Sequence, residues 1–304
     1  MISAIKPGGT TSPAAHPLLN NRYMRMALLL ALVLPACVVG SDGQTPSDDD
    51  VDPGPGPDPE PGDGISGNIT AARTLSGTVT FTGATTIDPG VVVTVEPGTV
   101  MNFRAASNLS IKGTLTVGGT KAAPVTLQPD PANTNGNFFG GLSVSGTLNM
   151  TYAVQHGGSI VTSSGGTATI TDSKMFAATG DFLIMNGGTV NVTYSQIGAD
   201  AGVTDTTHCN MHFGGTGNTI TVTNSNIIGT PYGLMFYGGQ LANFQNNNWE
   251  ENGTASADWI DSQPGVMGDF SGGYFPGGLP VAKSGATLTV NNPSATRLTD
   301  AGVR

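Results

Sequence analysis

A short phrase recurs along the middle of this 304-residue chain, and it constrains the fold more than any other feature. The phrase reads TLNMTYA, TATITDS, TVNVTYS and TITVTNS, followed by the looser LANFQNNN, between residues 147 and 249. The alternating runs are followed by Ala153, Ser173, Ser195, Ser225 and Asn247, at steps of 20, 22, 30 and 22 residues. A second short apolar run precedes each phrase: LSV, VTS, LIM, MHF and LMF. Such a unit cannot bury its apolar side alone, so the repeats are predicted to stack on one another.

Within each phrase apolar and polar residues alternate, and a period of two is typical of strands. Composition agrees, because the chain holds 45 Gly and only 11% charged residues, which gives many turn formers and few helix formers. No strongly periodic helical stretch follows residue 40. We therefore predict an all-β protein, a parallel β-helix with three short strands in each coil of about 22 residues.

Several segments carry a family resemblance. NFFGGLSVSG, VQHGG and FQNNNWEENG resemble the repeats of bacterial right-handed parallel β-helix proteins, the pectin-lyase-like fold. The stretch TTIDPGVVVTVEPGTVMNFRAASNLSIKGTLTVGGTKAAPVTLQP resembles the opening coils of surface proteins of that type. The resemblance covers residues 74–253 and implies the fold. It does not define the function, because this fold carries polysaccharide lyases, hydrolases, adhesins and structural proteins.

The aligned repeats predict which side chains face the interior of the stack. In the first strand of each coil these are Leu142, Val161, Leu183, Met211 and Leu234, followed two residues later by Val144, Ser163, Met185, Phe213 and Phe236. In the second strand they are Leu148, Ala168, Val190 and Ile220, followed by Met150, Ile170, Val192 and Val222. In the third strand Trp249 is expected to follow Ile197 and Ile227 in the core. Asn246 to Asn248 are expected at a coil turn, in hydrogen-bonded ladders between coils.

The segment MRMALLLALVLPAC combines a short basic start, an apolar run from Ala27 to Leu34, and Cys37. The run is too short to span a bilayer and predicts a signal peptide, with the true start at Met24 or Met26. LPAC resembles the lipobox of bacterial lipoproteins, which implies that Cys37 is lipidated and anchors the protein to a membrane. An ordinary signal peptide with a chance cysteine is the alternative interpretation.

Composition divides the chain into four parts. Residues 1–36 are the predicted signal peptide, 37–63 the lipidated N-terminus and an acidic linker, 64–253 the β-helix, and 254–304 an irregular Gly- and aromatic-rich cap with a final strand. The linker holds eight of the 21 acidic residues, and its Pro, Gly and like charges predict a disordered, extended spacer.

Charge and processing also limit the partners. The sequence pI of about 4.5 argues against nucleic acid, because phosphate binding needs clustered Lys and Arg. Val38 replaces the Asp that retains many lipoproteins at the inner membrane, so the outer membrane is expected, facing the periplasm or the cell surface. If Cys37 carries lipid, Cys209 has no partner for a disulfide.

The segment TTHCNMHFGG is the one stretch that invites a metal-site hypothesis, since His208 and His212 flank Cys209. On a strand, however, residues four apart lie ~13 Å apart and cannot share one ion. We expect His208, Asn210 and His212 to point outward, and Cys209 to be an inert buried thiol. The sequence therefore predicts no metal and no cofactor at this position.

Catalysis finds little support in the sequence. Polyuronate lyases of this fold need a basic residue at the substrate, whereas residues 175–282 contain neither Lys nor Arg. Hydrolases need paired carboxylates on one face. The acids of this region are Asp181, Asp200, Asp205, Glu250, Glu251, Asp258, Asp261 and Asp269, and most are expected at solvated turns. We therefore assign no catalytic residue, although an enzyme remains an alternative.

The outward positions of the second strands form four rows that are almost entirely threonine. They are Thr147, Asn149, Thr151; Thr167, Thr169, Thr171; Thr189, Asn191, Thr193; and Thr219, Thr221, Thr223. Thr is also simply a good strand former, which is the structural alternative. Rows of this kind resemble those of β-helical antifreeze proteins, and they form the predicted ligand-binding face.

Together these features predict a lipid-anchored module of the cell envelope that contacts glycan or another envelope component without catalysis. A polysaccharide-active lyase or hydrolase of the same fold is one alternative. Binding of ice or ordered water through the threonine rows is another. In the C-terminal segment, Trp259, Phe270, Tyr274 and Phe275 are expected to cap the open end of the helix, or else to stack on sugars.

Overall fold

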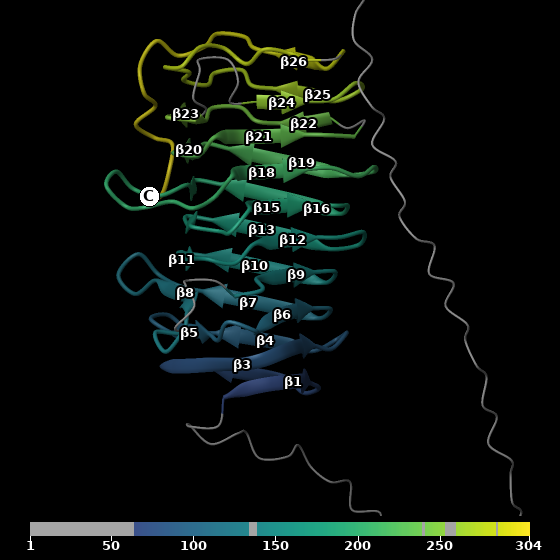
Figure 1. Ribbon diagram of the computed structural model, residues 1–304, viewed down its shortest axis with the longest axis vertical. Coiled ribbons are helices and arrows are strands. Elements are labelled where there is room, and N and C mark those ends of the chain that lie inside the picture. The colour runs from purple at the N-terminus through teal and green to yellow at the C-terminus, as the bar shows by residue number, and fades with distance from the viewer. Residues whose placement is uncertain (1–63, 134–138, 239–240, 253–259, 284) are drawn as a thin grey trace, which may run out of the picture. The chain divides into compact units, whose positions relative to one another are not determined.

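The computed structural model describes residues 64–133, 139–238, 241–252, 260–283 and 285–304, which all belong to one compact unit of the chain. Strands are the regular elements of these residues, and the described part of the chain contains no helix. Every strand pairing between them is parallel, and the strands stack into the layered coils seen in Figure 1. The prediction of an all-β parallel β-helix is confirmed.

Three columns of strands run along the stack, one from each side of the coils. The first column holds β1 (Ile65–Ile69), the second half of β3 (Thr78–Ile87), β6 (Asn108–Ile111), β9 (Leu142–Val144), β12 (Ile160–Thr162), β15 (Asp181–Met185), β18 (Cys209–Phe213), β21 (Tyr232–Phe236) and β24 (Ile260–Ser262).

The second column holds β2 (Arg73–Leu75), β4 (Val92–Val95), β7 (Thr114–Gly118), β10 (Thr147–Thr151), β13 (Thr167–Thr171), β16 (Thr189–Thr193), β19 (Thr219–Thr223), β22 (Leu241–Asn243), β25 (Met267–Asp269) and β26 (Thr287–Thr289). The third column holds the first half of β3, β5 (Val100–Phe103), β8 (Val125–Pro129), β11 (Ala153–His156), β14 (Lys174–Phe176), β17 (Gln196–Ile197), β20 (Asn226–Ile228) and β23 (Asn248–Glu250). The long strand β3 pairs with β5 and β6 and so joins the first and third columns into one sheet.

The turn between the second and third columns explains the repeat seen in the sequence. Its first residue takes a left-handed backbone with φ between 46° and 57° in five successive coils, at Tyr152, Asp172, Tyr194, Asn224 and Asn246. The next residue is buried and accepts a hydrogen bond from the backbone N–H of its counterpart one coil earlier. The pairs are Ala153 to Ser173 Oγ, Ser173 to Ser195 Oγ, Ser195 to Ser225 Oγ and Ser225 to Asn247 Oδ1, at 2.8–3.2 Å. The small polar residue is therefore fixed at this position because it satisfies a buried donor of the neighbouring coil. The predicted ladder is confirmed.

Apolar side chains from all three columns fill one continuous core along the stack. The predicted columns of the second strand are confirmed, since Leu148, Ala168 and Val190 are in register and fully buried. Ile197, Ile227 and Trp249 also pair as predicted. Towards the C-terminal end the ring of Phe244 contacts four other aromatic rings, those of Phe213, Phe236, Trp249 and Phe270, at centroid distances of 4.9–6.3 Å.

One predicted column was wrong by a single residue. Leu142 pairs with Ile160, and Ile160 pairs with Leu183, so Ile160 and Thr162 are buried while Val161 and Ser163 lie on the outer side. The slip arose because Ile160 and Val161 are both apolar, and a shift of one residue exchanges the two faces of a strand. Thr162 tolerates burial because its hydroxyl donates to the carbonyl oxygen of Ile184 at 3.4 Å.

The coils continue past residue 253. Strand β24 pairs with β21, β25 pairs with β22, and β26 pairs with β25, so the second column runs on to Thr289. Phe270, expected to cap the open end, is instead fully buried in the core, since the second column continues past it through β26; Trp259 lies outside the described residues. The last residues then descend beside the coils, drawn in yellow in Figure 1. They are held by Leu298 N–H to Asn248 Oδ1, by Gly302 N–H to the Asn224 carbonyl oxygen, and by Arg304 on Asp172.

Candidate functional site

The predicted threonine rows form a regular surface on the second column, which we call the threonine face. Thr147, Thr167, Thr189 and Thr219 are direct register partners in successive coils. The middle-row residues are also direct register partners, namely Asn149, Thr169, Asn191 and Thr221, as are the last-row residues Thr151, Thr171, Thr193 and Thr223. All twelve residues are partly or fully exposed, while the residues between them are buried. The backbone thus presents these side chains as a grid spaced ~4.8 Å between coils and ~6.7 Å along each strand.

The threonine face extends beyond the four coils identified in the sequence. Below β10, strand β7 adds Thr114 and Thr116 in register, and β4 adds Thr94. Above β19, strand β22 adds Asn243 in register with Thr221. The middle position of every coil from β4 to β22 is therefore Thr or Asn, and none of these side chains carries a charge.

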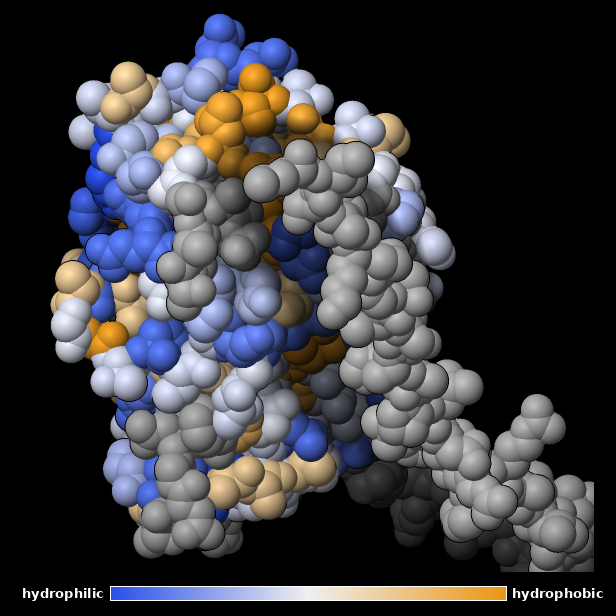
Figure 2. Space-filling view, turned by 45° about the horizontal axis from the view of Figure 1, so that its top comes forward, coloured by the Kyte–Doolittle hydropathy of each residue, from blue (hydrophilic) through white to orange (hydrophobic). Residues whose placement is uncertain are grey.

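Each threonine on this surface carries both a hydroxyl and a methyl group, so the surface is both polar and partly apolar. The hydroxyl oxygens of Thr171 and Thr193 lie 3.3 Å apart in hydrogen-bonding contact, which shows that neighbouring coils orient each other's side chains. The remaining hydroxyls have donors and acceptors available to a ligand. Figure 2 shows blue and pale residues along the left of the view and an orange, apolar patch near the top.

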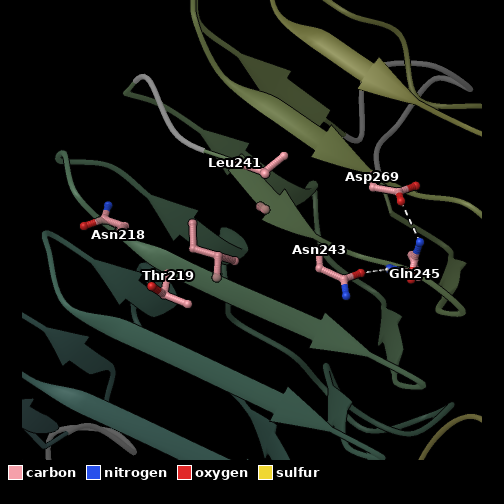
Figure 3. A pocket seen from close by; sticks show the side chains of 8 residues that line it. Asn218, Thr219, Leu241, Asn243, Gln245 and Asp269 are labelled. Atoms are coloured by element: carbon pink, nitrogen blue, oxygen red, sulfur yellow. Dashed lines mark hydrogen bonds between the residues drawn. The ribbon is translucent and has the colours of Figure 1, made fainter.

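A shallow groove of about 490 Å³ lies at the upper end of the threonine face (Figure 3). It is lined by Asn218, Thr219, Ile220, Leu241, Ala242, Asn243, Gln245 and Asp269. The Leu241 side chain is 66% exposed, and its register partner Met267 in the next coil is 46% exposed. Two large apolar side chains thus stand beside amide and carboxylate groups, a combination that suits the mixed surface of a sugar ring.

The polar groups of the groove are held in place by one another. Gln245 donates from Nε2 to Asp269 Oδ2 at 2.6 Å, and its backbone N–H donates to Asn243 Oδ1 at 3.1 Å. Burial works against ionisation of Asp269, but hydrogen bonds from Ser271 and Gln245 outweigh it and keep the pKa of this carboxyl below its usual value. Asp269 is therefore an ionised acceptor at neutral pH.

A second group of polar side chains lies on the first column, and sequence reasoning missed how they meet. His208 Nδ1 contacts Asp181 Oδ1 at 3.1 Å, and His212 Nδ1 contacts Asp181 Oδ2 at 2.5 Å. We call these three residues the histidine cluster. Both imidazoles are outward-facing as predicted, with side chains 51% and 33% exposed, whereas the Asp181 side chain is only 18% exposed. One carboxylate thus orients two histidines that lie four residues apart, His212 within β18 and His208 directly before it.

Aromatic and acidic side chains from the next coils border the histidine cluster. The ring of Tyr232 lies 5.2 Å from that of His208, and the ring of Tyr237 packs edge-on to His212 at 5.1 Å. Tyr237 donates its hydroxyl to Asp261 Oδ2 at 2.6 Å. Burial raises the pKa of the Tyr237 phenol, and the hydrogen bond to Asp261 and its charge raise it further, so this group keeps its proton.

The prediction that Cys209 is a buried thiol is confirmed, whereas the predicted position of Asn210 was wrong. Cys209 is fully buried, and its thiol donates to the Met211 carbonyl oxygen near Asp181 and Asp261. Asn210, expected to face outward, is 1% exposed and donates to Ile228 and Asn252.

The cause is a local break in alternation where these strands begin. Phe182 and Leu183 are both buried in β15, as are Gly233 and Leu234 in β21, and the second residue of each of these strands has no register partner. Burial raises the pKa of Cys209 to about 12, with the charge of Asp181 adding to the effect, so the thiol is unreactive at neutral pH.

Neither surface forms a metal-binding arrangement in the described part of the chain, where no three His, Cys, Asp or Glu side chains could hold an ion together. In the histidine cluster the two rings contact different oxygens of one carboxylate, so the Asp181 side chain lies between them. Asp181 follows Gly180, whose carbonyl oxygen accepts a hydrogen bond from the His208 backbone N–H at 2.8 Å, so the stacking of the coils places Asp181 beside His208. Its partnership with His212 depends on side-chain reach that alignment does not give.

Comparison with models of protein families, with curated proteins and with solved structures gives no match to this chain. The lipid-anchor candidate Cys37 lies outside the described residues. Among the residues that the structure does describe, no helix is long and apolar enough to cross a membrane. The function is therefore inferred from the chemistry of the two surfaces on the stack.

Proposed function

We propose that this protein is a lipid-anchored envelope protein of the pectin-lyase-like kind, which binds a neutral polysaccharide along its threonine face without cleaving the glycan chain. The observation that carries the proposal is the unbroken series of Thr and Asn at the middle outward position from β4 to β22. A repeating ligand suits a repeating surface, because each added coil offers the same hydroxyl and methyl groups to the next unit of the ligand.

The absence of charge on the grid favours a neutral ligand over an acidic one. Phosphate and uronate groups bind where Lys or Arg offsets their charge, and residues 175–282 contain neither. The acidic residues at this end of the stack, such as Asp269 in the groove, would repel an anionic chain. Sugar hydroxyls, in contrast, can both donate to and accept from Thr and Asn side chains.

The groove supplies what the flat grid lacks, which is a place to fix the register of the ligand. Leu241 in the groove offers apolar surface for the face of a sugar ring, its register partner Met267 adds apolar surface in the next coil, and Asn243 and Asp269 offer polar groups fixed by hydrogen bonds. Affinity for one sugar at an open groove is expected to be weak. Repeated contacts along the grid raise the affinity for a polymer over that for a monosaccharide.

The proposed envelope location rests on the sequence, through the LPAC motif and the acidic spacer of residues 42–63. A spacer of this composition would hold the β-helix away from the membrane surface. The threonine face would then be free to lie along a glycan chain of the envelope.

Two other functions are each favoured by one observation. The regular Thr grid also suits binding of ordered water at an ice surface, and the histidine cluster suits acid–base chemistry.

The first experiment is a screen of the full-length, detergent-solubilised protein against neutral and acidic unacylated glycans, with products followed by mass spectrometry. Retention of neutral polymers without cleavage is expected. Preferential retention of acidic glycans, or no retention at all, would contradict the proposal.

A further inference from the structure

We propose that the histidine cluster is an acid–base catalytic site that hydrolyses a carboxylic ester, with His212 as base, His208 as acid and Asp181 as the residue that positions both. The site lies on the first column and does not involve the threonine face. The assignment of the natural ester as an acyl group on a neutral sugar rests on the proposed function. The assignment of the acid–base site is independent of that function.

The positioning by Asp181 is the first step of the argument. An ionised carboxylate accepts hydrogen bonds only, so each Nδ1 that contacts Asp181 carries a proton. When either ring is neutral, its Nε2 is therefore the unprotonated nitrogen and can accept a proton. This is the arrangement by which a carboxylate orients a histidine base in hydrolases, and here one carboxylate orients two rings.

The availability of both Nε2 atoms is the second step. The side chains of His208 and His212 are partly exposed, and within the described residues neither Nε2 atom has a hydrogen-bond partner. The aromatic rings of Tyr232 and Tyr237 pack against the two imidazoles and restrict their rotation. Two rings oriented by one carboxylate, each with an open nitrogen, can take and give a proton in one reaction.

The class of substrate follows from the groups around the cluster. Anionic substrates are disfavoured, because residues 175–282 supply no Lys or Arg and the carboxylates of Asp181 and Asp261 are close. Glycosidic bond cleavage needs two carboxyl groups facing the bond, but Asp181 is occupied by both histidines and Asp261 accepts from Tyr237. Hydrolysis of a neutral ester needs a base for water and an acid for the leaving group, which the two imidazoles supply.

The roles follow from the geometry. His212 has the shorter contact with Asp181 and the less exposed side chain, so it is the base that removes a proton from water as the water oxygen bonds to the carbonyl carbon. The bond from that carbon to the alcohol oxygen then breaks, while protonated His208 gives its Nε2 proton to the departing oxygen. An alcohol and a carboxylic acid are released, the acid loses its proton to water, and both rings exchange protons with solvent to restore their starting states.

The test is hydrolysis of 4-nitrophenyl acetate and of cellobiose octaacetate by the full-length, detergent-solubilised protein, followed by release of nitrophenol and acetate. Because general acid or base catalysis contributes ~10²–10⁴-fold, His212→Ala is expected to lower kcat/KM at least about 100-fold, and His208→Ala by about 10-fold or more. The pH profile of the wild-type protein should fall on both the acid and the alkaline side. His208→Ala should remove one side of that profile.

Asp181→Asn tests the positioning role, because it keeps the shape of the side chain but accepts from Nδ1 less strongly. It is expected to lower the rate and to move the pH profile, while Asp181→Glu should restore part of the rate. The matched control is His156→Ala, which removes an outward histidine on β11 that stacks on Phe176 at 5.1 Å, away from the cluster. The control should keep the wild-type rate, and equal melting temperatures will show that all variants are folded.

Hydrolysis no faster than by an equal concentration of free imidazole would overturn the proposal, as would equal loss in His156→Ala and His212→Ala. Hydrolysis of the nitrophenyl ester alone would overturn the assignment of a sugar ester. Failure of the glycan screen would not affect the assay on 4-nitrophenyl acetate, so the two proposals fail separately.

Discussion

Replacing Phe213 with Ala tests the packing on which the whole stack depends. Phe213 is fully buried in β18, pairs with Met185 and Phe236 in the coils on either side, and stacks on Phe244 with ring centroids 6.3 Å apart. A buried aromatic side chain removes roughly 150 Å² or more from water, which at about 25 cal/mol per Å² corresponds to about 4 kcal/mol. Large-to-small core substitutions of this kind cost about 3–5 kcal/mol, because the surrounding coils collapse only partly into the cavity.

The assay is urea unfolding followed by circular dichroism and tryptophan fluorescence. The midpoint of the Phe213→Ala variant should fall while the dependence of the unfolding free energy on urea stays the same. The matched control is Phe213→Leu, which keeps most of the volume and should cost less than about 1.5 kcal/mol. A loss below about 1 kcal/mol in the Ala variant would show that Phe213 does not fill the core as described.

Three further predictions concern processing and the surface of β18. Replacing Cys37 with Ser should abolish metabolic labelling by fatty acid and move the protein to the soluble fraction; unchanged labelling would rule out the lipid anchor. Replacing His208 and His212 together with Ala should leave metal content unchanged and the unfolding free energy within about 1 kcal/mol, since exposed ion pairs contribute little; loss of a bound metal in this variant would contradict the metal-free site. The pKa of Cys209, raised to about 12, keeps the thiol neutral, so Cys209 should resist iodoacetamide at pH 8 in the folded protein but react in urea; equal labelling with and without urea would refute the burial. Because the folded state holds this proton more tightly than the unfolded state, stability should fall as the pH rises from about 9 towards 12.

The sequence predicted the repeating parts of the fold well, because repetition exposes the same physical requirement many times. Ser173, Ser195 and Ser225 recur because each must satisfy a buried donor of the neighbouring coil. The outward Thr rows were predictable for the same reason, since one alignment of β10 and β13 determines every side chain along both strands.

The parts that the sequence did not predict are those where one coil differs from the next. Val161 was placed inward because Ile160 beside it is equally apolar, so hydrophobicity alone could not choose between the two registers. In the histidine cluster, Asp181 contacts both rings of the next coil, which is lengthened by the 198–207 segment. The alternation of buried and exposed side chains is also broken at the start of β15 and β18. Such contacts depend on individual side-chain directions and not on a period.

The most direct test of the proposed function is the affinity of a retained neutral polysaccharide for a variant with a charged threonine face. Thr169→Lys with Thr221→Lys adds two long cations to the middle row, where both residues are partly exposed and their strands pair through β16. The control, Ser110→Lys with Thr126→Lys, adds the same charge to outward positions of β6 and β8 on the other two columns. We predict that the first variant loses retention by about tenfold or more, while the control binds like the wild type and both melt normally. Equal retention by all three proteins would contradict the account, as would thermal hysteresis of ice growth by the wild type that only the first variant loses.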